Sequence, residues 1–186
     1  MSTIKVNNIQ SRTGNAISFT SGDTITIPSG ATFTNNGTVT GFGDNTPSFF
    51  ATLSSNQSIS TGTFTKLAFD TTSWDTNSAF DTSNNRFVVP SGQAGKYFFQ
   101  FGVYADNIDD QEYFENYFFK NGSSINYGRF TEVAPRANHP VFYTTSVTVN
   151  MNVSDYMEIT VYHNDGVSNN VFSNTTFFSG FKLIGA

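Results

Sequence analysis

The sequence predicts an all-β protein whose main part is an antiparallel sandwich. The 186-residue chain consists of short segments rich in β-branched and aromatic residues, each bounded by Gly, Asn, Asp or Pro. No stretch has the period of an amphipathic helix. Aromatic residues make up 16% of the chain, which supplies material for a large core, and charged residues make up only 12%. This length suits one domain with a short appendage.

The first 43 residues predict a short β-rich stalk. Its glycines recur at intervals of eight, eight and seven residues, and each precedes a short alternating segment. Ile17, Ile25 and Phe33 hold equivalent places in three of these units. One apolar residue per unit is too little for a core within one chain, so we expect three chains to place these residues on a shared axis. The alternative is an unstructured tail with accidental spacing.

Gly, Asn and Pro cluster in residues 41–47 and the composition changes afterwards, which predicts a linker at residues 44–47. Residues 48–186 predict the sandwich, here called the knob. Its expected strands are 49–53, 63–69, 86–89, 96–104, 112–120, 141–151, 156–162 and 176–184. Turns are expected at 81–85, 120–123 and 163–166, where Asn and Gly tolerate a positive φ.

Several expected strands of the knob carry aromatic residues on both faces. In 96–104, Tyr97 and Phe99 share one face, whereas Phe98 and Tyr104 share the other. The same pattern occurs in 113–119 and 177–184. A two-layer sandwich needs one apolar face per strand, and large exposed apolar patches are unusual on monomers. We therefore expect the surplus faces to be buried against other copies of the chain.

Four motifs of the knob occur in a familiar order and spacing. Residues 79–90 read as an aromatic, a turn, Arg-Phe and a strand ending near Pro, and residues 95–101 as Gly-x-Tyr-x-Phe in a core strand. Residues 118–122 end a strand in Lys-Asn-Gly, and residues 176–183 give Thr-Phe-Phe-Ser-Gly-Phe-Lys-Leu. The knob thus resembles the C1q-like branch of the tumour-necrosis-factor-like jelly rolls. It departs from the family pattern in the additional Phe178 and in the turn at 152–158.

The resemblance implies a ten-strand jelly roll that forms a homotrimer and binds rather than catalyses. Separately, residues 2–10 and the Gly-rich run ending at Gly43 are similar to the N-terminal parts of fibre-type virion proteins of marine tailed bacteriophages. We expect Ile4, Val6 and Ile9 to attach the chain to the particle. The trimer interior is expected to contain Ile17, Ile25 and Phe33 of the stalk and Phe50, Phe98, Tyr104, Phe178 and Ile184 of the knob.

Catalysis is not expected. The chain has two histidines, His139 and His163, and no hydrolase, zinc-protease or phosphate-binding motif. The densest acidic segment contains Asp106, Asp109 and Asp110, whose oxygens could bind Ca²⁺. The alternative is a solvated acidic loop that keeps the assembly soluble, with no cofactor.

Trp74 lies in the polar segment 71–77, which we expect to be a loop. Its ring could stack on a sugar or on a receptor surface, because loops often carry function and aromatic residues dominate binding energies. The alternative is that the ring packs on its own loop.

Charge and hydropathy exclude several other classes of protein. The net charge of -5 and the absence of a basic patch argue against binding to nucleic acid. The start of the chain lacks the apolar core of a secretion signal, and no apolar run is long enough to span a membrane. We therefore expect a homotrimeric virion protein of a tailed phage, a short fibre or a capsid decoration, whose knob contacts a host glycan or protein. The alternative is a free carbohydrate- or receptor-binding module.

Overall fold

The computed structural model describes residues 24, 26, 28–32 and 45–184. The chain divides into two units, Met1–Phe42 and Gly43–Ala186, which are considered separately. In the first unit the Ala31 N–H donates to the Pro28 carbonyl at 3.0 Å, closing a turn in which Gly30 has a φ of 83°. This turn coincides with one of the glycines of the expected stalk repeat. The stalk predictions for Ile4, Val6, Ile9, Ile17, Ile25 and Phe33 lie outside the described residues.

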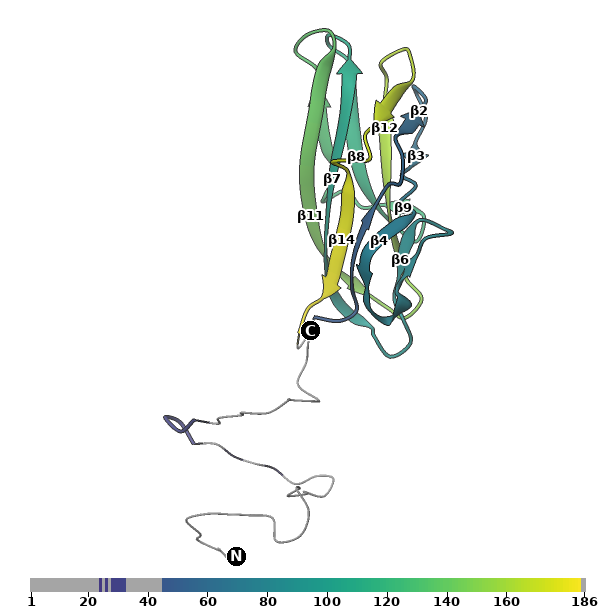
Figure 1. Ribbon diagram of the computed structural model, residues 1–186. Coiled ribbons are helices and arrows are strands. Elements are labelled where there is room, and N and C mark those ends of the chain that lie inside the picture. The colour runs from purple at the N-terminus through teal and green to yellow at the C-terminus, as the bar shows by residue number, and fades with distance from the viewer. Residues whose placement is uncertain (1–23, 25, 27, 33–44, 185–186) are drawn as a thin grey trace, which may run out of the picture. The chain divides into compact units, whose positions relative to one another are not determined.

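In the second unit, two antiparallel sheets pack face to face (Figure 1). The first sheet has the order β2-β13-β7-β14-β1-β4, with β11 along the other edge of β7. Its strands are β1 (Ser48–Thr52), β2 (Gln57–Ile59), β4 (Thr71–Asp75), β7 (Gly95–Ile108), β11 (His139–Met151), β13 (Asn169–Val171) and β14 (Phe177–Lys182). The long strand β7 therefore organises this sheet, with β14 and β13 sharing one of its edges.

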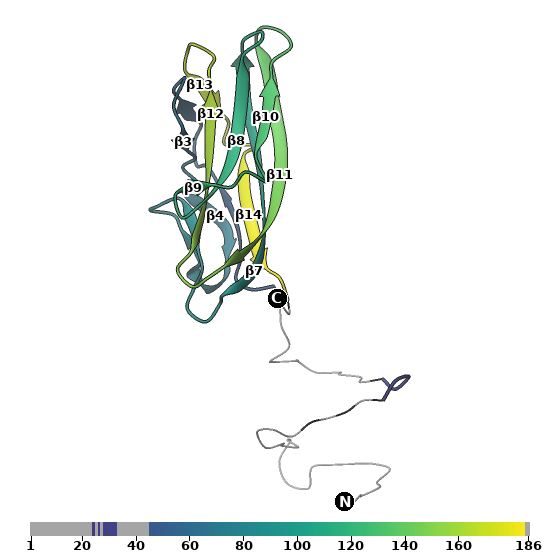
Figure 2. The same ribbon diagram turned by 180° about the vertical axis from the view of Figure 1, so that it is seen from behind.

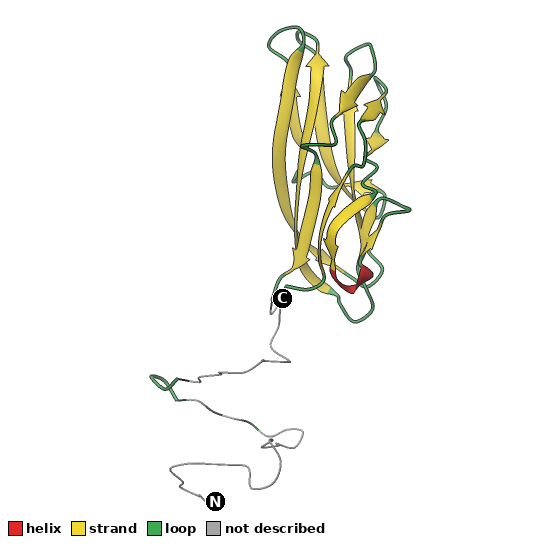
Figure 3. Cartoon of the chain, in the orientation of Figure 1, coloured by secondary structure: helices red, strands yellow, loops and turns green. Residues whose placement is uncertain are grey.

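The second sheet has the order β10-β8-β12-β6-β5, with β3 beside β12 and β9 beside β8. Its strands are β3 (Thr65–Lys66), β5 (Phe80–Asp81), β6 (Arg86–Val88), β8 (Tyr113–Lys120), β9 (Ser123–Ser124), β10 (Phe130–Val133) and β12 (Tyr156–His163). Figure 2 shows β10 and β11 side by side at one edge of the sandwich. Within residues 45–184 the only helix is a short 3-10 turn, η1 (Thr76–Ser78), drawn in red in Figure 3. The predicted all-β antiparallel class is confirmed.

The core lies between the sheets and is rich in phenylalanine. Alternate residues of each strand point into it, as the period of two predicts. The ring of Phe178 lies 4.8 Å from that of Phe49 and 6.0 Å from that of Phe99, and all three side chains are almost fully buried. The interface prediction is therefore wrong for Phe178, because its side chain fills the core of its own chain.

All eight expected strands of the knob are present at least in part, although 63–69 shrinks to the two-residue β3. The expected turns are confirmed by positive φ angles at Asn85, Asn121 and Gly166. The prediction missed six short strands: β2, β4, β5, β9, β10 and β13. Each has two to five residues, mostly polar at β4 and β9, so local patterning is too weak to reveal it.

Candidate functional site: the aromatic face of the first sheet

One face of the first sheet is turned away from the core and carries a group of aromatic side chains. In β7, Tyr97 and Phe99 are fully buried, whereas Phe98 and Tyr104 are partly exposed. In β1 the buried Phe49 precedes the partly exposed Phe50. We call this surface the aromatic face; its rings are Phe50, Trp74, Phe98, Tyr104, Phe142, Phe177 and Phe181.

The rings of the aromatic face contact one another across neighbouring strands. Phe50 stacks on Phe177 with ring centroids 5.4 Å apart and planes 9° apart. The same Phe50 ring lies 5.1 Å from Trp74, and the Phe98 ring lies 5.3 Å from Phe181. Such contacts hold the rings in place before any partner arrives, which lowers the entropy lost on binding.

The residues between these rings are neutral. Ser179 of β14, Gln100 of β7 and Ser146 of β11 pair directly across the sheet, and all three side chains point to this side. A partner that covers the centre of this face therefore buries no charge there, which avoids the large cost of desolvating an ion.

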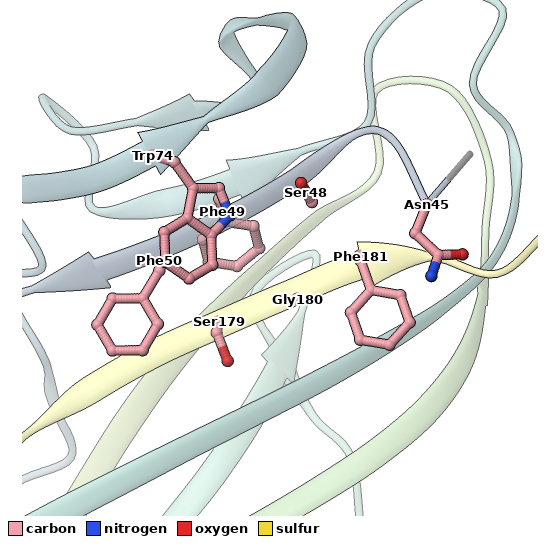
Figure 4. Close-up of a pocket in the computed structure, with 8 residues that line it drawn as sticks. All are labelled: Asn45, Ser48, Phe49, Phe50, Trp74, Ser179, Gly180 and Phe181. Atoms are coloured by element: carbon pink, nitrogen blue, oxygen red, sulfur yellow. The ribbon is translucent and has the colours of Figure 1, made fainter. Parts of the chain in front are cut away.

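A hollow of about 310 Å³ lies in the aromatic face where β1, β4 and β14 meet. In Figure 4, Trp74 and Phe50 lie towards one end, Phe181 lies at the other, and Ser179 lies between them. The remaining lining residues are Asn45, Ser48, Phe49 and Gly180. The volume is at the lower limit for small-molecule sites, and no ionisable side chain lines the hollow. Its chemistry suits an apolar or aromatic group.

The two-sheet arrangement has known structural counterparts. The globular domain of the zebrafish complement 1qA protein is similar with a TM-score of 0.56 at 14% identity, over 74% of this chain and 97% of that one. This sandwich is a C1q/TNF-like jelly roll. The Eiger TNF of S. frugiperda matches the chain with a TM-score of 0.54 at 12% identity, over 75% of this chain and 92% of that one.

Sequence comparison links the chain that carries this jelly roll to phage elements. It is 32% identical over 111 residues to the "Phage-like element PBSX protein XkdV" of Bacillus subtilis (strain 168), which is 57% of this chain and 16% of that protein. It is 34% identical over 107 residues to the "Uncharacterized protein YqcC" of the same organism, 55% of this chain and 28% of that protein. The chain thus spans less than a third of either relative. No protein-family model matches it.

The jelly roll places three of the predicted interface residues, Phe50, Phe98 and Tyr104, together on the aromatic face. Ile184 lies just beyond β14 and is 58% exposed. The prediction missed Phe177 and Phe181, the two partly exposed phenylalanines of β14. It named the buried Phe178 instead. The alternation along this strand carries the signal, but only the pairing of β14 shows which set faces outward.

Trp74 lies on the edge strand β4 rather than in a loop, so that prediction is corrected. It pairs with Phe50 of β1, and its side chain is 51% exposed. The residues around Trp74 are polar, so the sequence pattern does not predict the strand β4. The ring is available to a partner, but as part of the aromatic face and not of a loop.

The jelly roll does not gather the acidic residues that were considered for Ca²⁺. Among the described residues, no three His, Cys, Asp or Glu side chains form a group that could hold a metal ion, so Asp106, Asp109 and Asp110 do not converge. Asp106 and Asp110 accept hydrogen bonds from their neighbours Asn107 and Gln111. Asp109 and Asp110 are exposed, and Ca²⁺ binding by this segment stays a prediction.

The outer side of the second sheet carries a separate aromatic cluster. Phe64, from the loop before β3, lies 4.9 Å from the ring of Tyr162 and 5.3 Å from that of Tyr117. Tyr117 donates a short hydrogen bond to Glu115, which also pairs with Arg129. Burial and this hydrogen bond raise the pKa of Tyr117. Phe64 of the same chain thus packs on Tyr117 and Phe119 of β8, on a face for which the sequence predicts contact with other copies.

In the described part of the jelly roll and the first unit, no helix has the length and apolar character that crossing a membrane requires.

Proposed function

We propose that the chain is a non-enzymatic structural protein of a tailed-phage particle, either a short fibre or a capsid decoration. Three copies assemble through their aromatic faces, and the N-terminal segment, with Ile4, Val6 and Ile9, holds the assembly to the particle. The loops of the jelly roll then project towards the host surface, where they meet a glycan or a protein.

The observation that carries this proposal is the aromatic face itself. Seven rings lie on one side of one sheet, and the polar side chains between them are neutral. A monomer rarely leaves such a surface in water, because burying it is favourable by roughly 25 cal/mol per Å². The C1q/TNF-like resemblance also implies a homotrimer, so the surface and the fold point to the same assembly.

The similarity to a phage-element protein supports the particle, and the state of both histidines supports a role without catalysis. His163 is fully buried, and its Nε2 lies 3.0 Å from the Ile59 carbonyl oxygen. His139 lies 2.9 Å from Glu132. Each ring thus has one nitrogen in contact with a group of the fold, and the net charge of -5 disfavours nucleic acid as a partner.

Analytical ultracentrifugation of the full chain tests the assembly. We expect a trimer at micromolar concentration, and a monomer for Phe98→Glu, because a buried unpaired charge is costly. Phe64→Glu introduces the same charge on the exposed cluster of the second sheet and should leave the trimer intact. A natural chain that sediments as a stable monomer would refute the proposal.

A second test separates the particle-bound role from a free recognition module that binds a carbohydrate or receptor. That alternative is favoured by Phe64, which is 56% exposed beside Tyr117 and Tyr162. Deleting residues 1–43 should leave a folded trimer in both cases. Only the virion role requires that the truncated protein no longer copurifies with phage particles.

A further inference from the structure

The hollow between β1, β4 and β14 is an apolar site that its own chain leaves open. Trp74, the only tryptophan of the protein, forms part of its wall and is half exposed. Phe50 and Phe181 form further parts of that wall. An aromatic ring that entered from outside would contact these three side chains at once.

A cyclic assembly brings two different surfaces of the chain together at each interface. Its interfaces are head-to-tail, so the side of one copy that carries the hollow meets another side of the next copy. The hollow lies at the β4–β1 side of the first sheet, and β11 forms the edge at the other side of β7. The occupant should therefore come from the β11 side of a second copy.

The register of the first sheet shows which residues stand level with the hollow. Trp74 pairs with Phe50, Phe50 with Ser179, Ser179 with Gln100, and Gln100 with Ser146 of β11. We take the axis of the proposed trimer to run along the strands, so that rotation keeps every residue at its own level. The group that reaches the hollow should therefore lie beside Ser146.

Tyr127 is our candidate, because the residue that follows it packs against this part of β11. Gly128 lies against Val147, the residue after Ser146, because a Cβ atom built on Gly128 would be 3.5 Å from the Val147 Cβ. Nearby, the Ile125 N–H donates to the Phe118 carbonyl at 2.9 Å and fixes the segment between β9 and β10 to the edge of the sandwich (Figure 2). Tyr127 is 65% exposed, the highest value among the large apolar side chains of the described residues.

We infer that Tyr127 of a second copy inserts its ring into the hollow and contacts Trp74, Phe50 and Phe181. This inference rests on the proposed trimer and names the contact that specifies it. Each copy supplies one tyrosine and receives one, so the ring of three closes with every hollow filled. The neutral lining accepts the phenol ring without burying a charge.

Fluorescence of the single Trp74 reports directly on the hollow in the intact full-length chain. In the natural trimer we expect emission at short wavelength and weak quenching by acrylamide. Tyr127→Ala should shift the emission to longer wavelength and increase quenching, and should raise the concentration of half-dissociation by about tenfold or more, as for an aromatic hot spot. Tyr127→Phe keeps the ring and should behave as the natural chain does. Val153→Ala, at an exposed turn before β12, is the control for a lost surface side chain.

A second experiment is needed if Tyr127→Ala dissociates the assembly completely. It moves the large side chain from Tyr127 to the hollow itself. Ser179→Phe fills the hollow from within its own chain, at a partly exposed position that should not disturb folding. With the natural Tyr127 it should weaken the trimer, and Tyr127→Ala in the same chain should restore assembly.

The outcomes separate this inference from the proposed trimer. If the trimer persists and Trp74 is quenched equally in the natural chain and in Tyr127→Ala, Tyr127 does not occupy the hollow although the trimer stands. Failure of Tyr127→Ala to rescue Ser179→Phe would likewise show that Tyr127 does not enter the hollow. If the natural chain is a monomer, both proposals fall.

Discussion

Single residues set how closely the two sheets approach. Gly180 of β14 faces the core, and a Cβ atom there would lie 2.5 Å from Cδ1 of Phe99 and 3.0 Å from Cε1 of Phe49. Both rings are almost fully buried and cannot move away freely. Glycine at this position therefore allows the core rings to pack directly against the backbone of β14.

We expect Gly180→Ala to lower the free energy of unfolding by about 1–3 kcal/mol, the usual range for an overfilled core. Gly102→Ala is the matched control. Its Cβ atom would lie 2.5 Å from Cε1 of Phe177, a partly exposed ring that packs on the sheet surface and is not enclosed by the core. Urea denaturation measures both variants, and an equal loss in the two would contradict this explanation.

A second residue-scale prediction concerns Asp155, in the turn before β12. Burial alone would raise its pKa, but hydrogen bonds from the Asn152 N–H, the Asn121 amide and the Lys120 ammonium together lower the pKa to about 2. Because this value lies below the ordinary 3.8, the carboxylate stabilises the fold above about pH 4, and this contribution is lost as the pH falls towards 2.

At pH 7 we expect Asp155→Asn to lower the free energy of unfolding by about 1–2 kcal/mol, since one pKa unit corresponds to about 1.4 kcal/mol and the turn is partly solvated. Denaturation curves from pH 7 to pH 3 should show the natural chain and the variant converging as the pH falls. The exposed Asp110→Asn is the control and should change little. A difference that stays constant with pH would mean that the carboxylate charge is not responsible.

At the scale of the element, β14 presents its phenylalanines to two different surfaces. Its residues alternate between the core, which takes Phe178, and the aromatic face, which takes Phe177 and Phe181. Neighbouring phenylalanines therefore have different roles, although the sequence presents them as a pair.

In the Phe98→Glu background, which we expect to be monomeric, Phe178→Ala should lower the free energy of unfolding by about 3–5 kcal/mol. Phe177→Ala should cost about 1 kcal/mol in the same background, because its ring is only partly buried in one chain. In the otherwise natural chain, Phe177→Ala should instead raise the dissociation constant of the trimer. Equal losses for the two variants in the monomeric background would contradict the assignment of faces.

The long strands of the fold are easier to predict from the sequence than the short ones. Strands such as β7 and β12 combine β-branched or aromatic alternation with strong turn residues at their ends, so the sequence locates them. The edge strands β4 and β9 are short and polar, and they exist because β1 and β8 offer them a free edge. Their formation depends on contacts far along the chain, which a local pattern does not contain.

At the scale of the whole molecule, assembly should couple to stability. In the proposed trimer the associating chains are already folded, so association would add to the stability of the folded state by mass action. Its aromatic face is the surface that becomes buried.

We therefore expect the melting temperature of the full chain to rise with protein concentration. Calorimetry or circular dichroism between micromolar and hundred-micromolar concentrations measures this dependence. Phe98→Glu should melt at a temperature independent of concentration, whereas Phe64→Glu should keep the dependence. A natural chain whose melting temperature does not change with concentration would contradict association through this face.

The sequence by itself determined the all-β class, the long strands, the turns and the presence of aromatic residues on both faces of strands such as β7. These features follow from alternation and turn chemistry, which act over a few neighbouring residues. Only the tertiary structure decided that Phe178 points inward and Phe177 outward, that Trp74 lies on a strand, and that a hollow forms beside it. A shift of one residue in strand pairing exchanges the two faces, and that pairing joins β1, β7 and β14 from distant parts of the chain.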